Sequence, residues 1–140
     1  MRKRAAVLAI AACSRSAPIA SCDDDLRGVY TAGDERWMIL DDGATLEAYP
    51  VFPDGAAAAD LVIAPRVIDL SRSGGALRGT LRRRYMRRAE RCDAHVPVEV
   101  TRCAGDTLDV VLADPSPPAG FAPCAWPAPA APRVVHWRRD

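Results

Sequence analysis

Lysine, aromatic residues and net charge are scarce in this sequence, and it contains no long hydrophobic run. Only Lys3 among the 19 basic residues is a lysine, 6% of the 140 residues are aromatic, and the formal net charge is +1. A dedicated nucleic-acid binder carries an excess of positive charge, so we expect no nucleic-acid partner. The 49% of apolar residues exclude a disordered tail. Without a glycine period or a sustained heptad, the chain is neither collagen-like nor a coiled coil.

Motifs of catalytic and cofactor sites are also missing. His95 and His136 are the two histidines, and neither lies near a nucleophile motif such as G-x-S-x-G. There is no phosphate loop and no dinucleotide fingerprint. Cys92, Cys103, Cys124 and His95 have side chains that can bind zinc. Their spacing, however, matches no common zinc module. We therefore expect that the protein is not an enzyme and that it holds no metal ion and no cofactor.

A basic N-terminus followed by a short apolar run is the pattern of an export signal. Residues 1–4 (MRKR) are basic except for the initial methionine, and residues 5–12 (AAVLAIAA) are uncharged. As a helix, this run spans about 12 Å, whereas the hydrocarbon core of a bilayer is roughly 30 Å thick. A transmembrane anchor is therefore excluded at this point. We expect residues 1–12 to be a signal peptide and the remaining chain to be exported.

The apolar run ends in residues 10–13 (IAAC), which resemble the lipobox of bacterial lipoproteins: an aliphatic residue, two small residues and a cysteine. The resemblance implies cleavage before Cys13, acylation of Cys13, and anchoring through its acyl chains to a membrane of the cell envelope, at the outer membrane or in the periplasm. Cys22, in residues 19–22 (IASC), is the alternative lipidation site. Lipidation of Cys13 leaves an even number of cysteines for disulfides, which favours it. A secretory signal without lipidation is the remaining alternative.

The rest of the chain reads as a tether and one β domain. Residues 13–25 are small, polar and acidic, so we expect a lipidated N-terminus and flexible tether there, followed by a single β domain over residues 26–140. The expected strands are Arg27–Ala32, Arg36–Leu40, Ala44–Tyr49, Leu61–Leu70, Ala76–Arg84, Val96–Val100, Leu108–Leu112 and Arg133–Arg138. Seven or eight short strands at about ten-residue spacing predict an all-β fold, either a small antiparallel up-and-down barrel or a sandwich.

Prolines and cysteines suggest how the C-terminal region is held. Seven of the 12 prolines lie between Pro115 and Pro132, and proline cannot donate a ladder hydrogen bond, so residues 114–132 are expected to form an extended Pro-rich loop. In an oxidising compartment four cysteines are disulfide candidates: Cys22, Cys92, Cys103 and Cys124. Of the three possible connectivities, we expect one bond from Cys92 to Cys103, flanking the strand between them, and one from Cys22 to Cys124.

Arginines cluster in residues 78–91, which we call the basic strip. This segment holds seven arginines and one acid, Glu90. One interpretation is an anion site for anionic lipid headgroups or an acidic protein partner. Its candidate residues are Arg82, Arg83, Arg84, Arg87 and Arg88. The alternative is a solvated strand and loop whose charges are balanced by acidic residues elsewhere on the domain.

The direction of Arg83 depends on the secondary structure of the basic strip. In a strand, Leu77, Leu81 and Tyr85 face the core at a period of two. Arg83 then points the same way. In a helix beginning near Leu81, that residue stacks with Tyr85 and Ala89, and the arginines lie outside. The sequence is compatible with both.

The two ends of the domain carry a family resemblance. Gly28-Val29-Tyr30 opens the first expected strand, and Trp137-Arg138 closes the last. This is similar to calycins, the lipocalin-like barrels, in which a glycine and an aromatic residue of the first strand pack against an arginine of the last. The family usually has tryptophan where this chain has Tyr30. The resemblance implies a cup-shaped barrel that holds a small apolar ligand.

The sequence therefore predicts an exported, lipid-anchored, small β-domain protein of the cell envelope that acts by binding or as a structural element, not by catalysis. The preferred hypothesis is a carrier of a small apolar ligand or a lipid. The alternative is an envelope interaction module that uses the basic strip, Arg78–Arg91, to contact anionic lipid or an acidic protein partner.

Overall fold

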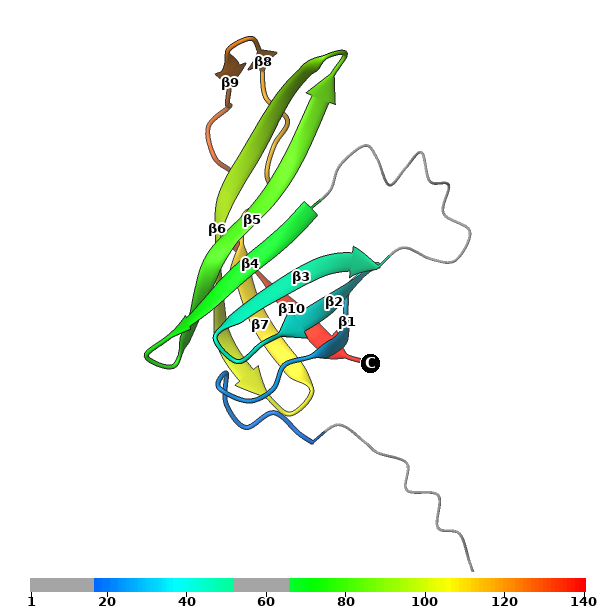
Figure 1. The fold of residues 1–140 in the computed structure, drawn as a ribbon, viewed down its shortest axis with the longest axis vertical. Coiled ribbons are helices and arrows are strands. Elements are labelled where there is room, and N and C mark those ends of the chain that lie inside the picture. Colours follow the sequence, from blue (N-terminus) through cyan, green and yellow to red (C-terminus); the bar gives the residue numbers. More distant parts are fainter. Residues whose placement is uncertain (1–16, 52–65) are drawn as a thin grey trace, which may run out of the picture.

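The computed structural model describes residues 17–51 and 66–140, and eight of its strands form a closed antiparallel barrel (Figure 1). The barrel strands are β1 (Gly28–Ala32), β2 (Glu35–Asp41), β3 (Thr45–Val51), β4 (Arg66–Ser73), β5 (Ala76–Arg87), β6 (Glu90–Ala104), β7 (Thr107–Leu112) and β10 (Arg133–Arg139). Each lies beside its neighbours along the chain, and β1 pairs with β10 to close the barrel. The predicted all-β, up-and-down barrel is confirmed, and the sandwich alternative is not formed. The described residues contain no helix, and thus none that could span a membrane.

The barrel is filled by alternate side chains of its strands, as the period of two requires. In β2, Trp37 and Ile39 are buried, whereas Met38 and Leu40 are exposed. The ring of Trp37 stacks on that of Trp137 from β10, with centroids 5.2 Å apart. In the described part of the chain, every residue of the core cluster is aliphatic, aromatic or cysteine. The core therefore depends on apolar packing.

The basic strip is a strand. Leu77 and Leu81 of β5 are 0% and 3% exposed, so the strand interpretation is right and the helix beginning near Leu81 is wrong. The strands β5 and β6 have 12 and 15 residues, and their hairpin extends well beyond the other strands (Figure 1). An ion pair from Arg84 to Asp93 at 2.9 Å bridges the two strands within this hairpin. The expected strand Val96–Val100 is only the middle of β6.

Between β7 and β10, the chain returns along the extended hairpin. This segment contains a two-stranded sheet of β8 (Gly120–Phe121) and β9 (Cys124–Ala125). The hydroxyl of Tyr85 in β5 donates a hydrogen bond of 2.7 Å to the main-chain oxygen of Pro115. The rings of Tyr85 and Trp126 meet edge to face, with centroids 6.3 Å apart. The hairpin and the segment therefore pack against each other outside the barrel.

The four predicted cysteines form two disulfides, but the expected pairing is wrong. Cys22 bonds to Cys103 and Cys92 bonds to Cys124, with Cα atoms 5.1 and 5.8 Å apart. The length of β6 explains the difference, because Cys92 and Cys103 lie on this one extended strand. Eleven residues of strand separate them by roughly 36 Å, whereas a disulfide requires Cα atoms within about 7 Å.

Residues 17–25, expected to be part of a flexible tether, pack on the end of the barrel that holds the β2–β3, β4–β5 and β6–β7 turns. We call this end the base. Ile19 is 4% exposed and exchanges two main-chain hydrogen bonds with Gly105, at 2.6 and 2.7 Å. Cys22 is bonded to Cys103, and Leu26 is fully buried. The expectation of a flexible tether therefore does not hold for residues 17–25, because an apolar side chain and a disulfide fix them to the barrel.

A buried ion pair fastens this N-terminal segment. Arg72 of β4 donates to the two carboxylate oxygens of Asp41 at 2.6 and 2.7 Å, and the two side chains are 10% and 3% exposed. The other acceptors of Arg72 are the main-chain oxygens of Cys22, Asp24 and Gly43. The hydrogen bonds from Arg72, more than any other contact, lower the pKa of Asp41 from 3.8 to about 2. Arg72 thus joins three chain segments at the base.

The first and last strands meet at the base as well. The Nε of Arg139 donates to the hydroxyl of Tyr30 at 3.0 Å, and its guanidinium lies 5.4 Å from the centre of that ring. Gly28, with a φ of 149°, faces the side chain of Arg139. The sequence resemblance pointed to Arg138 for this contact. Arg138 is one residue out of phase and instead pairs with Asp106 on the exterior.

Candidate functional site: the barrel mouth

The enclosed part of the barrel interior has almost no free space. Its cavity measures about 10 Å³ and is lined only by apolar side chains, among them Leu46, Val100 and Leu108. A cavity of this size holds about one water molecule at most. A ligand of several carbon atoms does not fit there without rearrangement of the core.

Free space that borders the core lies at one end of the barrel. A cavity of about 450 Å³, which we call the mouth, opens where β1 and β7 end and where β2, β4 and β10 begin. Trp37, Ile68 and Trp137 line it, and the last two also line the small interior cavity. These two side chains therefore form the floor that separates the mouth from the filled core. Leu81 and Val135 add apolar wall.

Charged side chains surround this apolar floor. Six of them line the mouth: Asp34, Glu35, Arg66, Arg83, Asp114 and Arg133. Four form two ion pairs, Arg66 with Glu35 at 2.6 Å and Arg133 with Asp114 at 3.0 Å. The guanidinium of Arg66 also lies 5.2 Å from the centre of the Trp37 ring. Within the described residues, Arg83 and Asp34 have no ion-pair partner.

Arg83 is the one arginine of the basic strip that lines the mouth. The strand alternation that buries Leu81 turns Arg83 toward the mouth, as the strand interpretation predicts. Its guanidinium lies 5.2 Å from the centre of the Tyr85 ring. Its Nε is buried and has no hydrogen-bond partner, the only such side-chain nitrogen or oxygen in the described residues. Directly across the β4–β5 pairing, Arg83 faces Arg66.

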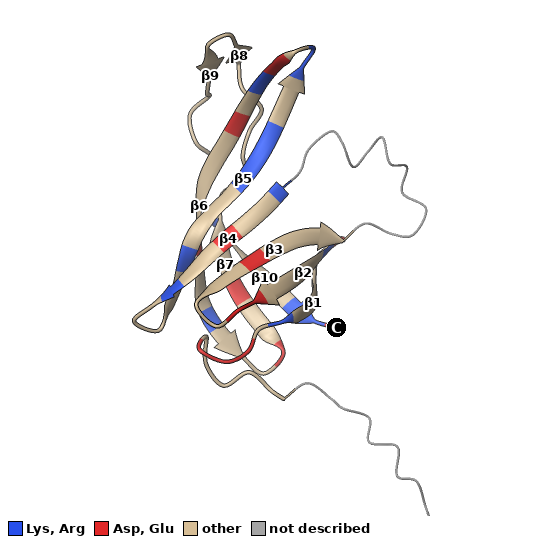
Figure 2. Cartoon of the chain, viewed as in Figure 1, with Lys and Arg blue, Asp and Glu red and all other residues tan. Residues whose placement is uncertain are grey.

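The other arginines of the basic strip do not join Arg83 in one site. Five of them form ion pairs with carboxylates on β4 and β6: Arg78–Glu99, Arg82–Asp69, Arg84–Asp93, Arg87–Glu90 and Arg91–Asp93. Figure 2 shows basic bands on β5 next to acidic bands on β4 and β6. Arg88 sits in the hairpin turn with a φ of 55°. The five predicted anion-binding residues therefore point in different directions, and three of them are already paired.

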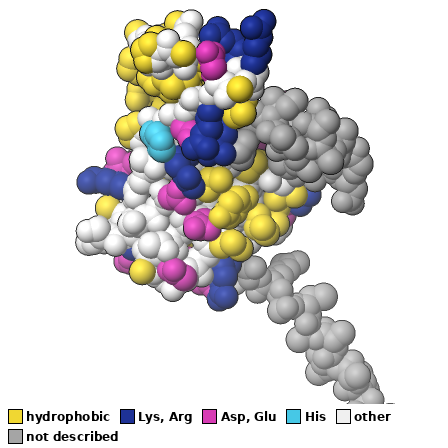
Figure 3. All heavy atoms as spheres, turned by 45° about the horizontal axis from the view of Figure 1, so that its top comes forward, with side chains coloured by type: hydrophobic (Ala, Val, Ile, Leu, Met, Phe, Trp, Pro, Cys, Tyr) yellow, Lys and Arg dark blue, Asp and Glu magenta, His cyan; other side chains and the backbone are white. Residues whose placement is uncertain are grey.

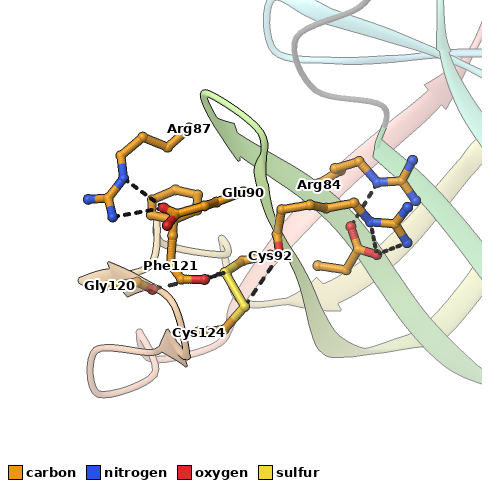
Figure 4. The surroundings of a disulfide bond; sticks show 9 residues. Arg84, Arg87, Glu90, Cys92, Gly120, Phe121 and Cys124 are labelled. Atoms are coloured by element: carbon orange, nitrogen blue, oxygen red, sulfur yellow. Dashed lines mark hydrogen bonds and ion pairs between the residues drawn. A yellow bond between two sulfur atoms is a disulfide. The ribbon is translucent and has the colours of Figure 1, made fainter.

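A disulfide bond joins the far end of the β5–β6 hairpin to the small β8–β9 sheet. Figure 4 shows the Cys92–Cys124 disulfide between these elements, with Arg87 near Phe121. The guanidinium of Arg87 lies 4.7 Å from the centre of the Phe121 ring. Met86 is 52% exposed at the same end. Basic and hydrophobic atoms consequently lie side by side on this end of the surface (Figure 3).

A second cavity, of about 370 Å³, lies outside the barrel between β6 and residues 114–132, which we call the Pro-rich segment. His95 and Trp126 line it together with Pro115, Pro127 and Pro129. Its lining is largely proline and alanine, and no side chain of the lining has a buried polar atom without a partner. The polar side chains of the lining are His95, Ser116 and two carboxylates already in ion pairs, Asp93 and Asp114.

The residues considered for catalysis and metal binding are dispersed. The Nδ1 of His136 lies 2.7 Å from Asp109 on the exterior of the barrel, far along the chain from His95 on β6. Cys92, Cys103 and Cys124 are bonded in disulfides and are not free to ligate zinc. The described residues contain no cluster of three metal-ligating side chains. These histidines therefore form no common centre.

The lipidation candidates differ in what the structure says of them. Cys13 lies outside the described residues. Cys22 is described, and its sulfur is bonded to that of Cys103. A sulfur in a disulfide is not available for a thioether bond to a lipid.

Sequence reasoning found Arg83 but missed most of the mouth. Trp37, Arg66 and Arg133 come from three strands far apart in the sequence, and only barrel closure brings them together. The available signal was the inward phase of Trp37 and Trp137 in their strands. No pattern in the sequence indicates that Arg66 faces Arg83.

Comparisons with known proteins add no assignment. No protein-family model matches the chain, and no match was found among curated proteins or solved structures. The functional conclusion therefore rests on the geometry of the mouth.

Proposed function

We propose that this chain is an exported, lipid-anchored protein of the cell envelope that binds a small apolar ligand or lipid in the mouth of its barrel, and that it acts by binding, not by catalysis. One observation carries the proposal: a cavity of about 450 Å³ with a floor of Trp137 and Ile68 and the ring of Trp37 beside it. Ligand sites commonly have volumes of about 300–1,000 Å³ and apolar, aromatic linings.

The filled interior determines where the ligand lies. Because the enclosed cavity offers only about 10 Å³, the apolar part of a ligand rests above Ile68 and Trp137, not deep in the barrel. The calycin resemblance supports a carrier function. The features it implies include an up-and-down barrel and the packing of Gly28 and Tyr30 against an arginine of the last strand, which Arg139 provides.

Export and lipidation have separate support. Two disulfides in a chain of this size are typical of an oxidising compartment outside the cytoplasm. The disulfide of Cys22 favours Cys13 as the acylated residue. We expect metabolic labelling with a radioactive fatty acid to label the wild type and the Cys22→Ser variant but not Cys13→Ser. Label retained in Cys13→Ser would remove Cys13 as the site.

Ligand binding is tested with a neutral alkyl probe, 11-bromoundecan-1-ol, whose bromine quenches tryptophan fluorescence on contact. In the Trp126→Phe variant, the remaining tryptophans are Trp37 and Trp137, both at the mouth. We expect saturable quenching of this variant. Absence of saturable quenching would contradict the proposed function.

A matched pair of substitutions locates the bound probe. Ala32 is buried and lines the mouth, whereas Ala131 is exposed in the Pro-rich segment. Ala32→Phe places a ring into the mouth and is expected to weaken quenching of Trp37 and Trp137. Ala131→Phe is expected to leave it unchanged. Near-ultraviolet circular dichroism of both variants checks that the barrel is folded.

The alternative, an interaction module built on the basic strip, has weaker support. Five of its seven arginines share four carboxylates, Asp69, Glu90, Asp93 and Glu99, which leaves a net charge of about +3 on the strip and its partners. Salt screens exposed charges of this kind beyond about 10 Å. We therefore place the function at the mouth and not on the strip.

A further inference from the structure

We infer that the ligand of the mouth is an amphipathic anion, a molecule with one anionic headgroup on an apolar body, and that Arg83 is the residue that binds the headgroup. The inference rests on the proposed function, because it names the ligand class of that same site. It assigns to Arg83 a specificity role that its neighbours in the basic strip do not share.

The first observation is the unmet hydrogen-bonding capacity of Arg83. Its Nε is buried at the wall of the mouth and has no partner in the described residues. A buried donor left unsatisfied costs free energy, and more so when it belongs to a charged group. Exposed side chains of the strip avoid this cost by pairing, as Arg82 and Arg84 do with Asp69 and Asp93. An acceptor supplied from outside the chain would complete Arg83.

The second observation is the like-charge pair across β4 and β5. Arg66 and Arg83 are direct partners in the strand register, and both line the mouth. Like charges placed opposite each other destabilise a strand pair. Glu35 compensates Arg66 at 2.6 Å, and Asp114 compensates Arg133 at 3.0 Å. Among the described residues, the positive charge of Arg83 is the one that remains uncompensated on the wall.

Asp34 is the other unpaired charge of the lining, and it differs from Arg83 in its surroundings. It is an exposed residue of the turn between β1 and β2, so its carboxylate is accessible to solvent. Arg83 instead has a buried Nε. The charge that lacks compensation inside the mouth is therefore positive, and the complementary ligand group is negative.

The apolar floor specifies the rest of the ligand. Leu81 lies two residues before Arg83 on the same face of β5, and both border the cavity that reaches Trp37 and Trp137. An anion without an apolar body leaves this floor uncovered, and a neutral alkyl molecule leaves Arg83 unsatisfied. A guanidinium binds carboxylates and phosphates through two parallel hydrogen bonds. The geometry thus fits a headgroup on Arg83 and an apolar body over the tryptophans.

The test compares two probes that differ only in the headgroup, 11-bromoundecanoate and 11-bromoundecan-1-ol, by quenching of Trp37 and Trp137 in the Trp126→Phe protein. The acid is expected to bind about tenfold more tightly than the alcohol, as a charge-assisted hydrogen bond requires. Arg83→Gln is expected to abolish this preference, so that the acid and the alcohol bind with equal affinity. Arg82→Gln, on the neighbouring outward position, is expected to preserve it.

The outcomes separate this inference from the proposed function. Equal binding of acid and alcohol by the Trp126→Phe protein would overturn the inference while supporting the mouth as a ligand site. A preference for the acid that persists in Arg83→Gln would overturn the role of Arg83. Quenching by neither probe would overturn both. Inorganic phosphate alone is expected not to displace 11-bromoundecanoate, and displacement would show that the mouth binds free anions and would overturn the amphipathic ligand class.

Discussion

The base of the barrel offers a quantitative test of the fold through Asp41. Its carboxylate accepts hydrogen bonds from Arg72 at 2.6 and 2.7 Å and from the main-chain nitrogens of Leu26 and Gly43 at 2.9 and 2.8 Å. Replacing it in Asp41→Asn keeps the size of the side chain and removes its charge. Arg72 then retains its main-chain oxygen acceptors but loses its one carboxylate partner.

The magnitude follows from the pKa of Asp41. Hydrogen bonding, chiefly from Arg72, lowers that pKa from 3.8 to about 2. At 1.36 kcal/mol per pH unit, this difference corresponds to about 2 kcal/mol of stability. In urea, with a typical slope of about 2 kcal/mol per molar, Asp41→Asn should unfold about 1 M below the wild type at pH 7.

The pH dependence has a definite sign. Because the folded protein holds the pKa of Asp41 below its unfolded value of 3.8, the stabilisation is complete above that value and is lost as the pH falls toward about 2. Urea unfolding of wild type and Asp41→Asn should therefore differ at pH 7 and converge near pH 2. The exposed Asp34 gives the control, since Asp34→Asn should change stability by less than about 0.5 kcal/mol. An undiminished difference at pH 2 would refute the reasoning.

Two further predictions concern the disulfides and one glycine. Replacing both Cys22 and Cys103 with serine should lower the free energy of unfolding by about 4 kcal/mol, because their bond closes a loop of 81 residues. In this variant, protease should cleave within residues 17–25. The equivalent Cys92 and Cys124 variant should leave residues 17–25 protected and expose the Pro-rich segment instead, and cleavage at the same place in both variants would contradict the pairing. Gly79→Ala should destabilise the barrel by about 1–3 kcal/mol in thermal unfolding, since its Cβ would overlap the facing β4 backbone, and an unchanged Tm would contradict that packing.

The sequence alone predicted which residues share a face of a strand and where most strands end. The period of two predicted that Val135 and Trp137 share one face of the last strand, and the strand interpretation of the basic strip turned Arg83 the same way as Leu81. Turn signals placed the ends of most strands within two residues. These features are set by neighbouring residues, so a sequence read without a structure contains them.

Features that depend on strand length and barrel closure were not predictable. The disulfide pairing followed from how far β6 continues beyond the expected strand Val96–Val100. Cross-strand ion pairs such as Arg84–Asp93 lie within that continuation. The contact of Arg72 with Asp41 joins positions 31 residues apart, and local sequence carries no record of it. The mouth also required closure, since Arg66 meets Arg83 only in the register of two paired strands.

Binding of a ligand in the mouth can be followed through the indole N–H signals of the three tryptophans. In ¹⁵N-labelled protein titrated with 11-bromoundecanoate, we expect the signals of Trp37 and Trp137, which line the mouth, to shift and saturate. The signal of Trp126, outside the barrel, should stay in place. Shifts confined to Trp126, or no shift of Trp37 and Trp137, would contradict the account.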